Sequence, residues 1–228
     1  MSEPWRSLIT SLSHKSPLAE AFRTLRTNTQ FAAVGKPLQT ILVTSAGSLE
    51  GKSTTVANLG VALAQSGAKV ILVDADLRRP SLHQFFRLQK GSGLTTVLMG
   101  RDLDRALEET GIEGLRLLTS GPIPPNPSEM LGSPAFANLI EALRTRADYV
   151  ILDSPPAIAV TDANIIASIA DGTLLVVEIG KTARQFAVRA KEQLTQSKAN
   201  IIGVVLTNVS KTAEYNYYYY YYQYPDKA

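Results

Sequence analysis

The 228-residue chain contains no cysteine. Disulfide bonds and thiolate metal centres are therefore excluded, and this composition suits a protein of the cytoplasm. No apolar run approaches the roughly 20 residues that a membrane-spanning helix needs. Residues 1–10, which include Glu3 and Pro4, lack the apolar core of a signal peptide. We expect a cytoplasmic protein, which a partner must recruit if it works at the inner face of the cell membrane.

An excess of charge of one sign is also missing. The net charge is only +3 and the basic residues are scattered along the chain. Such a distribution predicts no binding of nucleic acid and no direct binding to a membrane surface. Hydrophobic residues make up 45% of the chain, which is enough to bury a core, and no internal repeat divides it.

Short apolar runs typical of buried parallel strands alternate with helical segments. The strands are expected at 40–44, 70–73, 115–118, 149–152, 174–178 and 201–206, and the helices at 52–65, 135–145 and 183–197. A first helix begins at Ser16-Pro17, a favourable helix start, and runs to about Val34. Residues 121–127, with four prolines, form a stiff loop. The pattern predicts an α/β fold, a twisted and mostly parallel sheet with helices on both faces.

A phosphate-binding loop lies between the first strand and the next helix. Residues 46–53 fit the P-loop pattern G-x-x-x-x-G-K-[ST], except that the first glycine is Ala46. The backbone N–H groups of such a loop wrap a phosphate at the positive end of the helix, the lysine contacts the β- and γ-phosphates, and the hydroxyl holds Mg²⁺. The ATP-binding residues expected here are Gly47, Ser48, Leu49, Glu50, Gly51, Lys52, Ser53 and Thr54.

Acidic residues end two of the other strands. Asp74 and Asp76, with Arg78, follow the strand at 70–73, and Asp153 follows the strand at 149–152. A single acid at a strand end is often only a helix cap. In a parallel sheet, however, these ends lie together on the side where ligands bind. Three acids beside one phosphate-binding loop indicate Mg²⁺ held through water, plus one spare base.

The C-terminal residues are rich in tyrosine. Eight of the nine tyrosines lie in the last fourteen residues: Tyr215, Tyr217, Tyr218, Tyr219, Tyr220, Tyr221, Tyr222 and Tyr224. The run could be an edge strand, because tyrosine favours strands. Six phenols would crowd both faces of such a strand, however, and turn-forming residues bracket the run. We therefore interpret residues 209–228 as a mobile tail that follows a P-loop domain at 16–208 and an N-terminal extension at 1–15.

The whole chain resembles the bacterial tyrosine kinases, the autokinases of capsule and exopolysaccharide synthesis. The resemblance rests on the P-loop, on the D-x-D-x-R and D-x-x-P sequences after two apolar strands, and on the tyrosine cluster. Glu20, Arg23 and Arg26 match the family's E-x-x-R-x-x-R oligomerisation motif, and residues 124–129 are similar to another loop of the family. The resemblance implies a P-loop NTPase fold and ATP-dependent protein-tyrosine autophosphorylation.

The family also implies site residues and partners. Lys52, Asp74, Asp76 and Asp153 would be catalytic, with Ser53, Asp76 and Asp153 at Mg²⁺ and Asp74 as base, although Asp74 and Asp76 could exchange roles. An asparagine is expected near the adenine, where this chain has Thr207, so Asn208 is a substitute candidate. The tail tyrosines would be the phosphate acceptors. The expected partners are further copies in an octamer-like ring, a membrane-bound modulator of the polysaccharide co-polymerase type, and a phosphatase and polysaccharide-synthesis enzymes as substrates.

Two other functions share these motifs. A nucleotide-switched positioning ATPase, of the septum-site or plasmid-partition type, has the same fold and acids. Proteins of that type, however, share a second lysine in the P-loop, at the position where this chain has Gly47. A scaffold that binds nucleotide without chemistry requires the acids to be structural. The charged stripe of Glu20, Arg23 and Arg26 can also be read as a solvated helix face of little energetic value. Leu18, Phe22, Leu25 and Thr29 define another face of the same helix.

Overall fold

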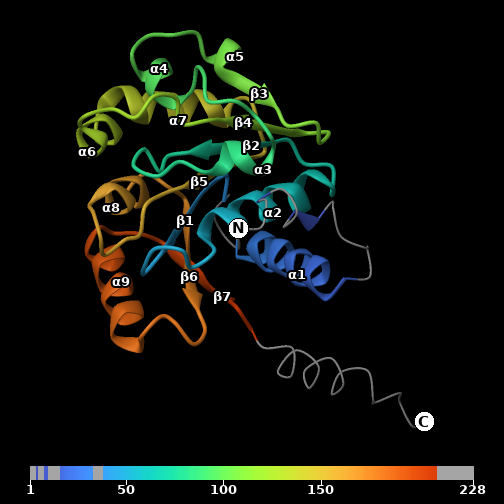
Figure 1. Cartoon of the computed structure of the whole chain (residues 1–228), viewed down its shortest axis with the longest axis vertical. Coiled ribbons are helices and arrows are strands. Elements are labelled where there is room, and N and C mark those ends of the chain that lie inside the picture. Colours follow the sequence, from blue (N-terminus) through green and yellow to red (C-terminus); the bar gives the residue numbers. More distant parts are fainter. Residues whose placement is uncertain (1–3, 5–7, 10–15, 33–37, 210–228) are drawn as a thin grey trace.

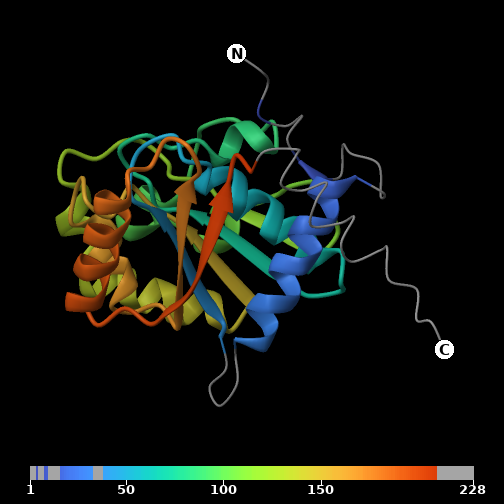
Figure 2. The same ribbon diagram turned by 90° about the horizontal axis from the view of Figure 1, so that it is seen from below.

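A seven-stranded sheet runs through the middle of the molecule, with helices on both faces (Figures 1 and 2). The computed structural model describes residues 4, 8–9, 16–32 and 38–209. The strands follow the order β3-β4-β2-β5-β1-β6-β7, all parallel to their neighbours except β3, which is antiparallel to β4. They are β1 (Thr40–Ser45), β2 (Val70–Asp74), β3 (Leu107–Glu109), β4 (Leu115–Leu118), β5 (Tyr149–Asp153), β6 (Gly172–Glu178) and β7 (Ile201–Thr207).

The helices fall into two groups according to the face of the sheet that they cover. On one face lie α1 (Pro17–Phe31), α2 (Lys52–Ala64) and α3 (Leu82–Phe85). On the other lie α4 (Leu94–Leu98), α5 (Leu103–Ala106), α6 (Pro127–Leu131), α7 (Pro134–Arg144), α8 (Asp162–Ala167) and α9 (Arg184–Gln196). No helix of the described residues is both long and apolar enough to cross a membrane.

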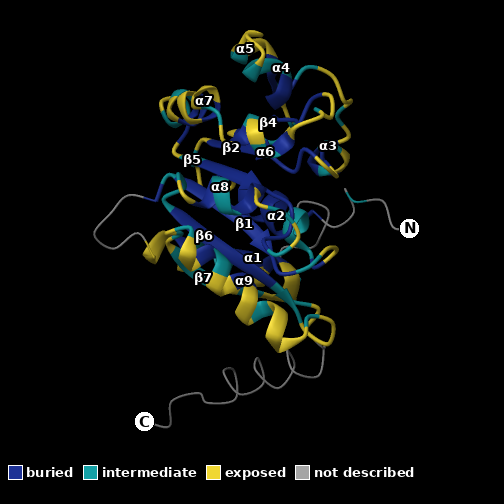
Figure 3. Ribbon diagram, turned by 90° about the vertical axis from the view of Figure 1, so that its left-hand side faces the viewer, coloured by how far each residue is buried: buried dark blue, intermediate teal, exposed yellow. Residues whose placement is uncertain are grey.

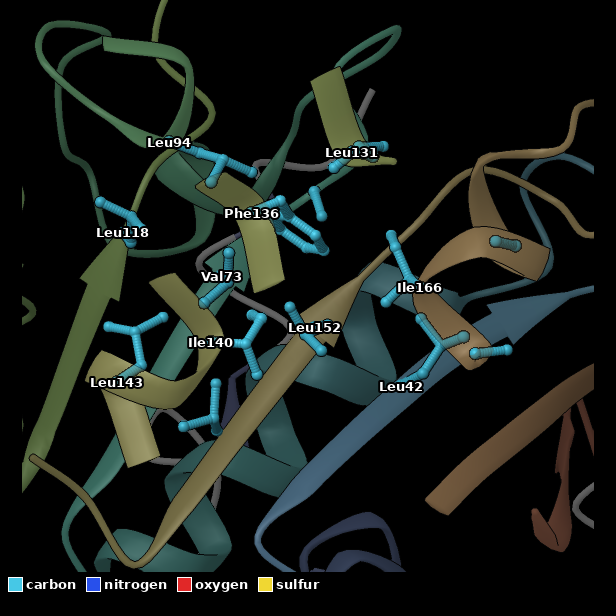
Figure 4. Close-up of a cluster of buried hydrophobic side chains, with 14 of the residues drawn as sticks. Leu42, Val73, Leu94, Leu118, Leu131, Phe136, Ile140, Leu143, Leu152 and Ile166 are labelled. Carbon is cyan, nitrogen blue, oxygen red and sulfur yellow. The ribbon is translucent and has the colours of Figure 1, made fainter. Parts of the chain in front are cut away.

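The central strands are buried on both faces (Figure 3). All residues of β1 and β2 are buried, which is why these strands are continuous apolar runs rather than alternating ones. On one face, Phe136 and Ile140 of α7 pack over Val73 and Leu152 of the sheet (Figure 4). Each such side chain contributes roughly 1.5–3 kcal/mol when it is fully buried. This rigid sheet fixes the positions of the loops that leave its carboxyl edge.

The predicted fold class is confirmed. All six predicted strands are present, and their ends differ from the prediction by at most two residues. The antiparallel β3 and the short helices α3, α4, α5, α6 and α8 were not predicted, because each is only three to six residues long and has little periodicity to detect. The predicted stiff loop at 121–127 overlaps the start of α6 at Pro127.

Helix α1 begins at Pro17 as predicted and ends at Phe31, and residues 33–37 lie outside the described part. Its predicted apolar face is partly wrong. Phe22 and Thr29 are buried, but Leu18 is 42% exposed and Ala19 is buried in its place. The tyrosine tail and most of the N-terminal extension also lie outside the described residues.

Candidate functional site

The functional side chains meet where the neighbouring strands β2, β5 and β1 end. In the sheet, Asp74 of β2 lies directly opposite Asp153 of β5, and Val43 of β1 pairs with the same Asp153. The strand ends are joined further by a hydrogen bond from the Ala75 N–H to the Asp153 carbonyl oxygen at 3.0 Å. The carboxyl ends therefore converge as the sequence predicts.

The loop between β1 and α2 has the geometry of a phosphate cradle. Gly51, at the N-cap of α2, has a φ of 89°, and the N-cap is not closed by a side-chain hydrogen bond. The first N–H groups of the helix consequently remain available to an anion. Ala46, where the motif has its first glycine, is fully buried and is not among the residues with positive φ, so a glycine is not needed there.

Lys52 and Ser53 of this loop contact the strand-end acids. Lys52 Nζ lies 3.0 Å from Asp76 Oδ2 and 3.9 Å from Asp153 Oδ1. Ser53 Oγ donates a hydrogen bond to Asp153 Oδ2 at 2.5 Å. The structure thus brings together Lys52, Ser53, Asp76 and Asp153, four residues that the motifs had selected.

The charges of this cluster perturb one another. Burial lowers the pKa of Lys52, but the negative charges of Asp153 and Asp76 outweigh that effect, so its pKa is raised above the usual value. Burial raises the pKa of Asp153 to about 6, although Lys52 and the hydrogen bond from Ser53 act in the opposite direction. Lys52 is therefore a fixed positive charge at neutral pH, and Asp153 is mostly ionised there.

Asp74 has a different environment from the other two acids. It is fully buried, and its Oδ2 accepts hydrogen bonds from the backbone N–H groups of Ser81 and Leu82, both at 3.0 Å. Burial, followed by repulsion from Asp153, raises the pKa of Asp74 to about 8. At neutral pH this carboxyl group is largely protonated, and it fixes the start of α3.

The P-loop is also tied to two segments from the C-terminal part of the chain. Glu50 is buried, and its Oε1 accepts a hydrogen bond from Thr182 Oγ1 at 2.6 Å, while its carbonyl oxygen accepts one from Thr207 Oγ1 at 2.8 Å. Lys181 Nζ donates to the Leu49 carbonyl oxygen at 2.7 Å. These contacts hold the loop from the side of β6 and β7. The sequence did not reveal them, because the partners lie 132 to 157 residues away.

Arg78 connects the loop after β2 with α6 and α8. Its guanidinium group donates to both carboxylate oxygens of the buried Asp162, at 2.9 and 3.1 Å, and to Ser128 Oγ at 3.1 Å. Ser128 in turn donates to Asp162 at 2.6 Å. Asp162 was missed, since an acid at the start of a helix is typical of a simple dipole contact.

A cavity of about 570 Å³ opens over this site. Lys52, Ser53 and Asp76 line it together with Arg79, and other parts of its wall come from Ser48, Leu49, Gly51, Thr54, Arg78, Ser81, Phe85, Pro155, Pro156, Ala159 and Val160. The cavity therefore joins a phosphate-binding side to an apolar wall that can receive an aromatic ring.

The remaining predicted positions lie around this centre. Asn208 donates a hydrogen bond from Nδ2 to the Ile179 carbonyl oxygen at 3.3 Å, and Gly47 is packed so closely that a Cβ would lie 2.8 Å from Glu50 Oε1. On α1, Arg23 pairs with Glu20 at 2.6 Å, and Arg26 donates to the Ala62 carbonyl oxygen at 3.3 Å. Arg23 and Arg26 of the charged stripe therefore already make contacts within a single copy of the chain.

The site has too few ligands to enclose a metal ion on its own. Among the described residues, no group of three or more His, Cys, Asp or Glu side chains is placed to hold a metal. Mg²⁺, however, commonly takes only one or two carboxylates, with the other positions filled by water and by substrate phosphates. Asp153 Oδ1 is buried and has no hydrogen-bond partner in the described part of the chain. Asp153 and Ser53 therefore fit such an open site.

Comparison with known proteins relates this geometry to an activity. The chain is 44% identical over 225 residues to the tyrosine-protein kinase YwqD of Bacillus subtilis. This match covers 97% of this chain and 95% of the relative. Its structure matches the crystal structure of the chimerical protein CapA2B2 with a TM-score of 0.86 and 40% identity, over 90% of this chain and 91% of that one. The kinase domain of the Escherichia coli tyrosine kinase ETK matches with a TM-score of 0.82 and 30% identity, over 92% and 84% of the two chains.

A family model described as an iron-transfer P-loop NTPase (NUBPL) also matches, at residues 37–217. Iron–sulfur clusters are held mainly by cysteine thiolates, and this chain has no cysteine. The match therefore supports the P-loop fold rather than iron transfer. The kinase relatives are similar over nearly the whole chain and distinguish this protein from the positioning ATPases, with which it shares the fold.

Proposed function

The chain belongs to the P-loop protein-tyrosine kinases of bacteria, and from this premise we propose that it phosphorylates its own C-terminal tyrosines in trans, within a ring of copies. The observation that carries the proposal is the group of Lys52, Ser53, Asp76 and Asp153 at the P-loop, open to a cavity with an apolar wall. We also propose that this autokinase regulates the synthesis of capsular and extracellular polysaccharide, as its similarity to the kinases of that family suggests.

ATP binding is assigned to the loop at 47–54. The uncapped N–H groups of α2 would hold the β-phosphate, and Lys52 would move from Asp76 toward the β- and γ-phosphates. Ser53 and Asp153 would hold Mg²⁺ mostly through its waters, which leaves the Asp76 carboxylate free for another role. When bound, the ion would neutralise charge on the phosphate oxygens. Asn208 remains the candidate for the adenine side.

The transfer makes one bond and breaks another. The phenol oxygen of a tyrosine bonds to the γ-phosphorus, while the bond from that phosphorus to the β–γ bridging oxygen breaks and ADP leaves with its electron pair. Lys52 stabilises the negative charge on the transferred group. The phenol has a pKa near 10, so its proton is lost late, to a carboxylate.

We assign the base to Asp76 rather than Asp74. Asp76 lines the cavity, whereas Asp74 lies behind it, bonded to the N–H groups of Ser81 and Leu82. A largely protonated carboxyl group cannot accept a proton, and the pKa of Asp74 is raised to about 8. Asp74 therefore serves to position the loop that carries Asp76.

The tail is long enough to reach a neighbouring copy. About a dozen residues separate Asn208 from the centre of the tyrosine run, which at ~3.3 Å per residue spans up to ~40 Å. Glu20, Arg23 and Arg26 are the proposed contacts between copies in an octamer-like ring. Six phosphotyrosines would add about −9 to −12 charges to a net charge of +3, so phosphorylated tails would repel one another and loosen the ring.

A membrane-bound modulator of the polysaccharide co-polymerase type is the proposed activator, which would recruit this cytoplasmic kinase to the inner face of the cell membrane. A phosphatase and enzymes of polysaccharide synthesis are the proposed further partners. The support for the modulator is the similarity to the CapA2B2 chimera and the family resemblance. Comparing the phosphotyrosine content of protein made with and without a membrane-bound modulator of this type tests the proposed activation.

Mixing two variants tests transfer in trans. The acceptor is a full-length Lys52→Met chain, which keeps its tail but lacks the charge needed for transfer. The donor is a full-length chain whose eight tail tyrosines are changed to phenylalanine. With Mg-ATP and any required activator, we expect phosphate on the tail of the Lys52→Met chain by mass spectrometry, and none when that chain is alone. If this tail stays unmodified in a verified mixed ring while the parent labels itself, transfer in trans is wrong.

A further inference from the structure

Two adjacent arginines that line the cavity, Arg78 and Arg79, differ in the contacts of their side chains. Arg78 is held by the buried Asp162 and by Ser128. The side chain of Arg79 is exposed and lines the cavity. Within residues 38–209 no hydrogen bond or ion pair of the Arg79 guanidinium is found, and only its backbone N–H is engaged. Arg79 is thus a positive charge on the cavity wall that the described residues do not neutralise.

The backbone places Arg79 beside the reaction centre. Its N–H donates to Asp76 Oδ1 at 2.9 Å, and the other oxygen of Asp76 accepts from Lys52 at 3.0 Å. Lys52 and Asp76 already serve the nucleotide and the phenol in the proposed function. The cavity wall around Arg79 includes Ser81 and Phe85, which do not belong to the phosphate cradle. Arg79 therefore lies on a part of the cavity wall outside the phosphate cradle, which is the part left for an acceptor.

The acceptor segment creates a charge problem that a kinase for isolated tyrosines does not have. Tyr217–Tyr222 are contiguous, so as transfers accumulate the remaining acceptors come to lie beside phosphorylated tyrosines. Each phosphate adds roughly −1.5 to −2 charges, and ATP in the same cavity is also negative. In an extended segment, residues two apart point to the same side about 7 Å from each other. When one tyrosine of such a segment enters the cavity, a phosphate on the tyrosine two residues away therefore comes to the cavity wall.

We propose that Arg79 binds the phosphate of a phosphotyrosine two residues from the acceptor, so that the site favours tyrosine-rich segments that are already phosphorylated. The planar guanidinium group matches phosphate with two parallel hydrogen bonds. It offsets the repulsion that would otherwise stop the reaction after a few transfers. Arg79 makes and breaks no bond in the transfer, and the inference rests on the proposed tyrosine-kinase function.

Comparing the rates on two peptides distinguishes binding of a neighbouring phosphotyrosine by Arg79 from a role of Arg79 in the transfer itself. Both copy residues 212–226 with Tyr220 as the single acceptor. In the plain peptide the other tyrosines are phenylalanine, and in the primed peptide positions 218 and 222 are phosphotyrosine. The enzyme is the full-length chain with its tail tyrosines changed to phenylalanine, so that it cannot label itself there. Rates are measured at low peptide concentration to give kcat/KM, with Mg-ATP and any required activator.

With Arg79 present, we expect the primed peptide to react at least as fast as the plain one. Arg79→Gln should lower kcat/KM about fivefold for the primed peptide, as expected for an exposed charge pair, and less than twofold for the plain peptide. Arg79→Lys should recover part of the loss, and added salt should reduce the advantage of the primed peptide. Arg189→Gln, on the exposed side of α9, is the matched control and should change neither rate.

Equal losses on both peptides would overturn the proposal, because they would place Arg79 at ATP or at the transferred phosphate. An unchanged ratio of the two rates in Arg79→Gln would overturn it as well. Failure of the underlying kinase function has a different result. In that case neither peptide would be labelled by the chain that retains Arg79, and the parent would not label its own tail.

Discussion

The buried carboxyl group of Asp74 makes the stability of the protein depend on pH. Its pKa is 3.8 in the unfolded chain and about 8 in the folded one. The stability that such an acid contributes is fully present below its unfolded pKa, falls as the pH rises above that value, and is gone once the pH has passed the folded pKa. Between pH 6 and 8 the folded protein holds a proton that the unfolded chain has released, so the free energy of unfolding falls by up to about 1.4 kcal/mol per pH unit.

We therefore expect the free energy of unfolding to fall by about 2 kcal/mol from pH 6 to pH 8 because of Asp74. Asp74→Asn should remove this fall, since an amide has no proton to lose and its oxygen can still accept the hydrogen bonds from Ser81 and Leu82. At pH 8 the variant should be more stable than the parent. Asp153, with a pKa of about 6, adds its own pH dependence mainly below this window.

Chemical denaturation at pH 6, 7 and 8, without nucleotide, measures this effect. Asp104→Asn, which changes a carboxylate with a 70% exposed side chain, is the control and should keep the pH slope of the parent. Parallel stability curves for the parent and for Asp74→Asn would refute the reasoning. They would mean that Asp74 is ionised in the folded protein, and would return it to consideration as the base.

Three further predictions concern assembly and packing. Changing Arg23 and Arg26 to Ala should convert the proposed ring into smaller species in light scattering and lower autophosphorylation; an unchanged mass would leave the stripe as a solvated face. Asp162→Ala removes a buried partner of an ion pair, and should lower the free energy of unfolding by about 3 kcal/mol in denaturation, where a loss below 1 kcal/mol would contradict it. Gly93→Ala places a Cβ 2.3 Å from a backbone carbonyl oxygen and should cost about 2 kcal/mol, whereas Gly91→Ala, with open space around it, should cost much less.

Much of the fold and the centre of the site could be predicted from local sequence. The strands β1, β2 and β5 are continuous apolar runs, and each is followed by residues with recognisable chemistry. Because parallel strands end at one edge, the convergence of Lys52, Asp76 and Asp153 follows from their positions alone. Ala46 departs from the P-loop pattern, which has a glycine at this position, and the structure shows that no glycine is needed there because Ala46 does not have a positive φ.

The rest depended on contacts between distant segments. Asp74 and Asp76 are two residues apart and look equivalent in sequence, but one is capped by backbone N–H groups and the other faces the cavity. That difference arises from how the chain turns after β2. Likewise, Thr182 and Thr207 are ordinary polar residues until the fold brings them to Glu50.

The distant contacts of the P-loop determine when the protein can first bind a nucleotide during its synthesis. The loop leaves β1, whose two neighbours in the sheet are β5 and β6, and it is fastened by Lys181, Thr182 and Thr207. A chain emerging from the ribosome therefore carries the whole phosphate motif long before the segments that shape it have been made. Because the tyrosines follow soon after β7 in the sequence, the nucleotide site and its proposed acceptors become complete almost together. A nascent chain that stops before β7 would have neither a finished site nor the proposed acceptor tyrosines.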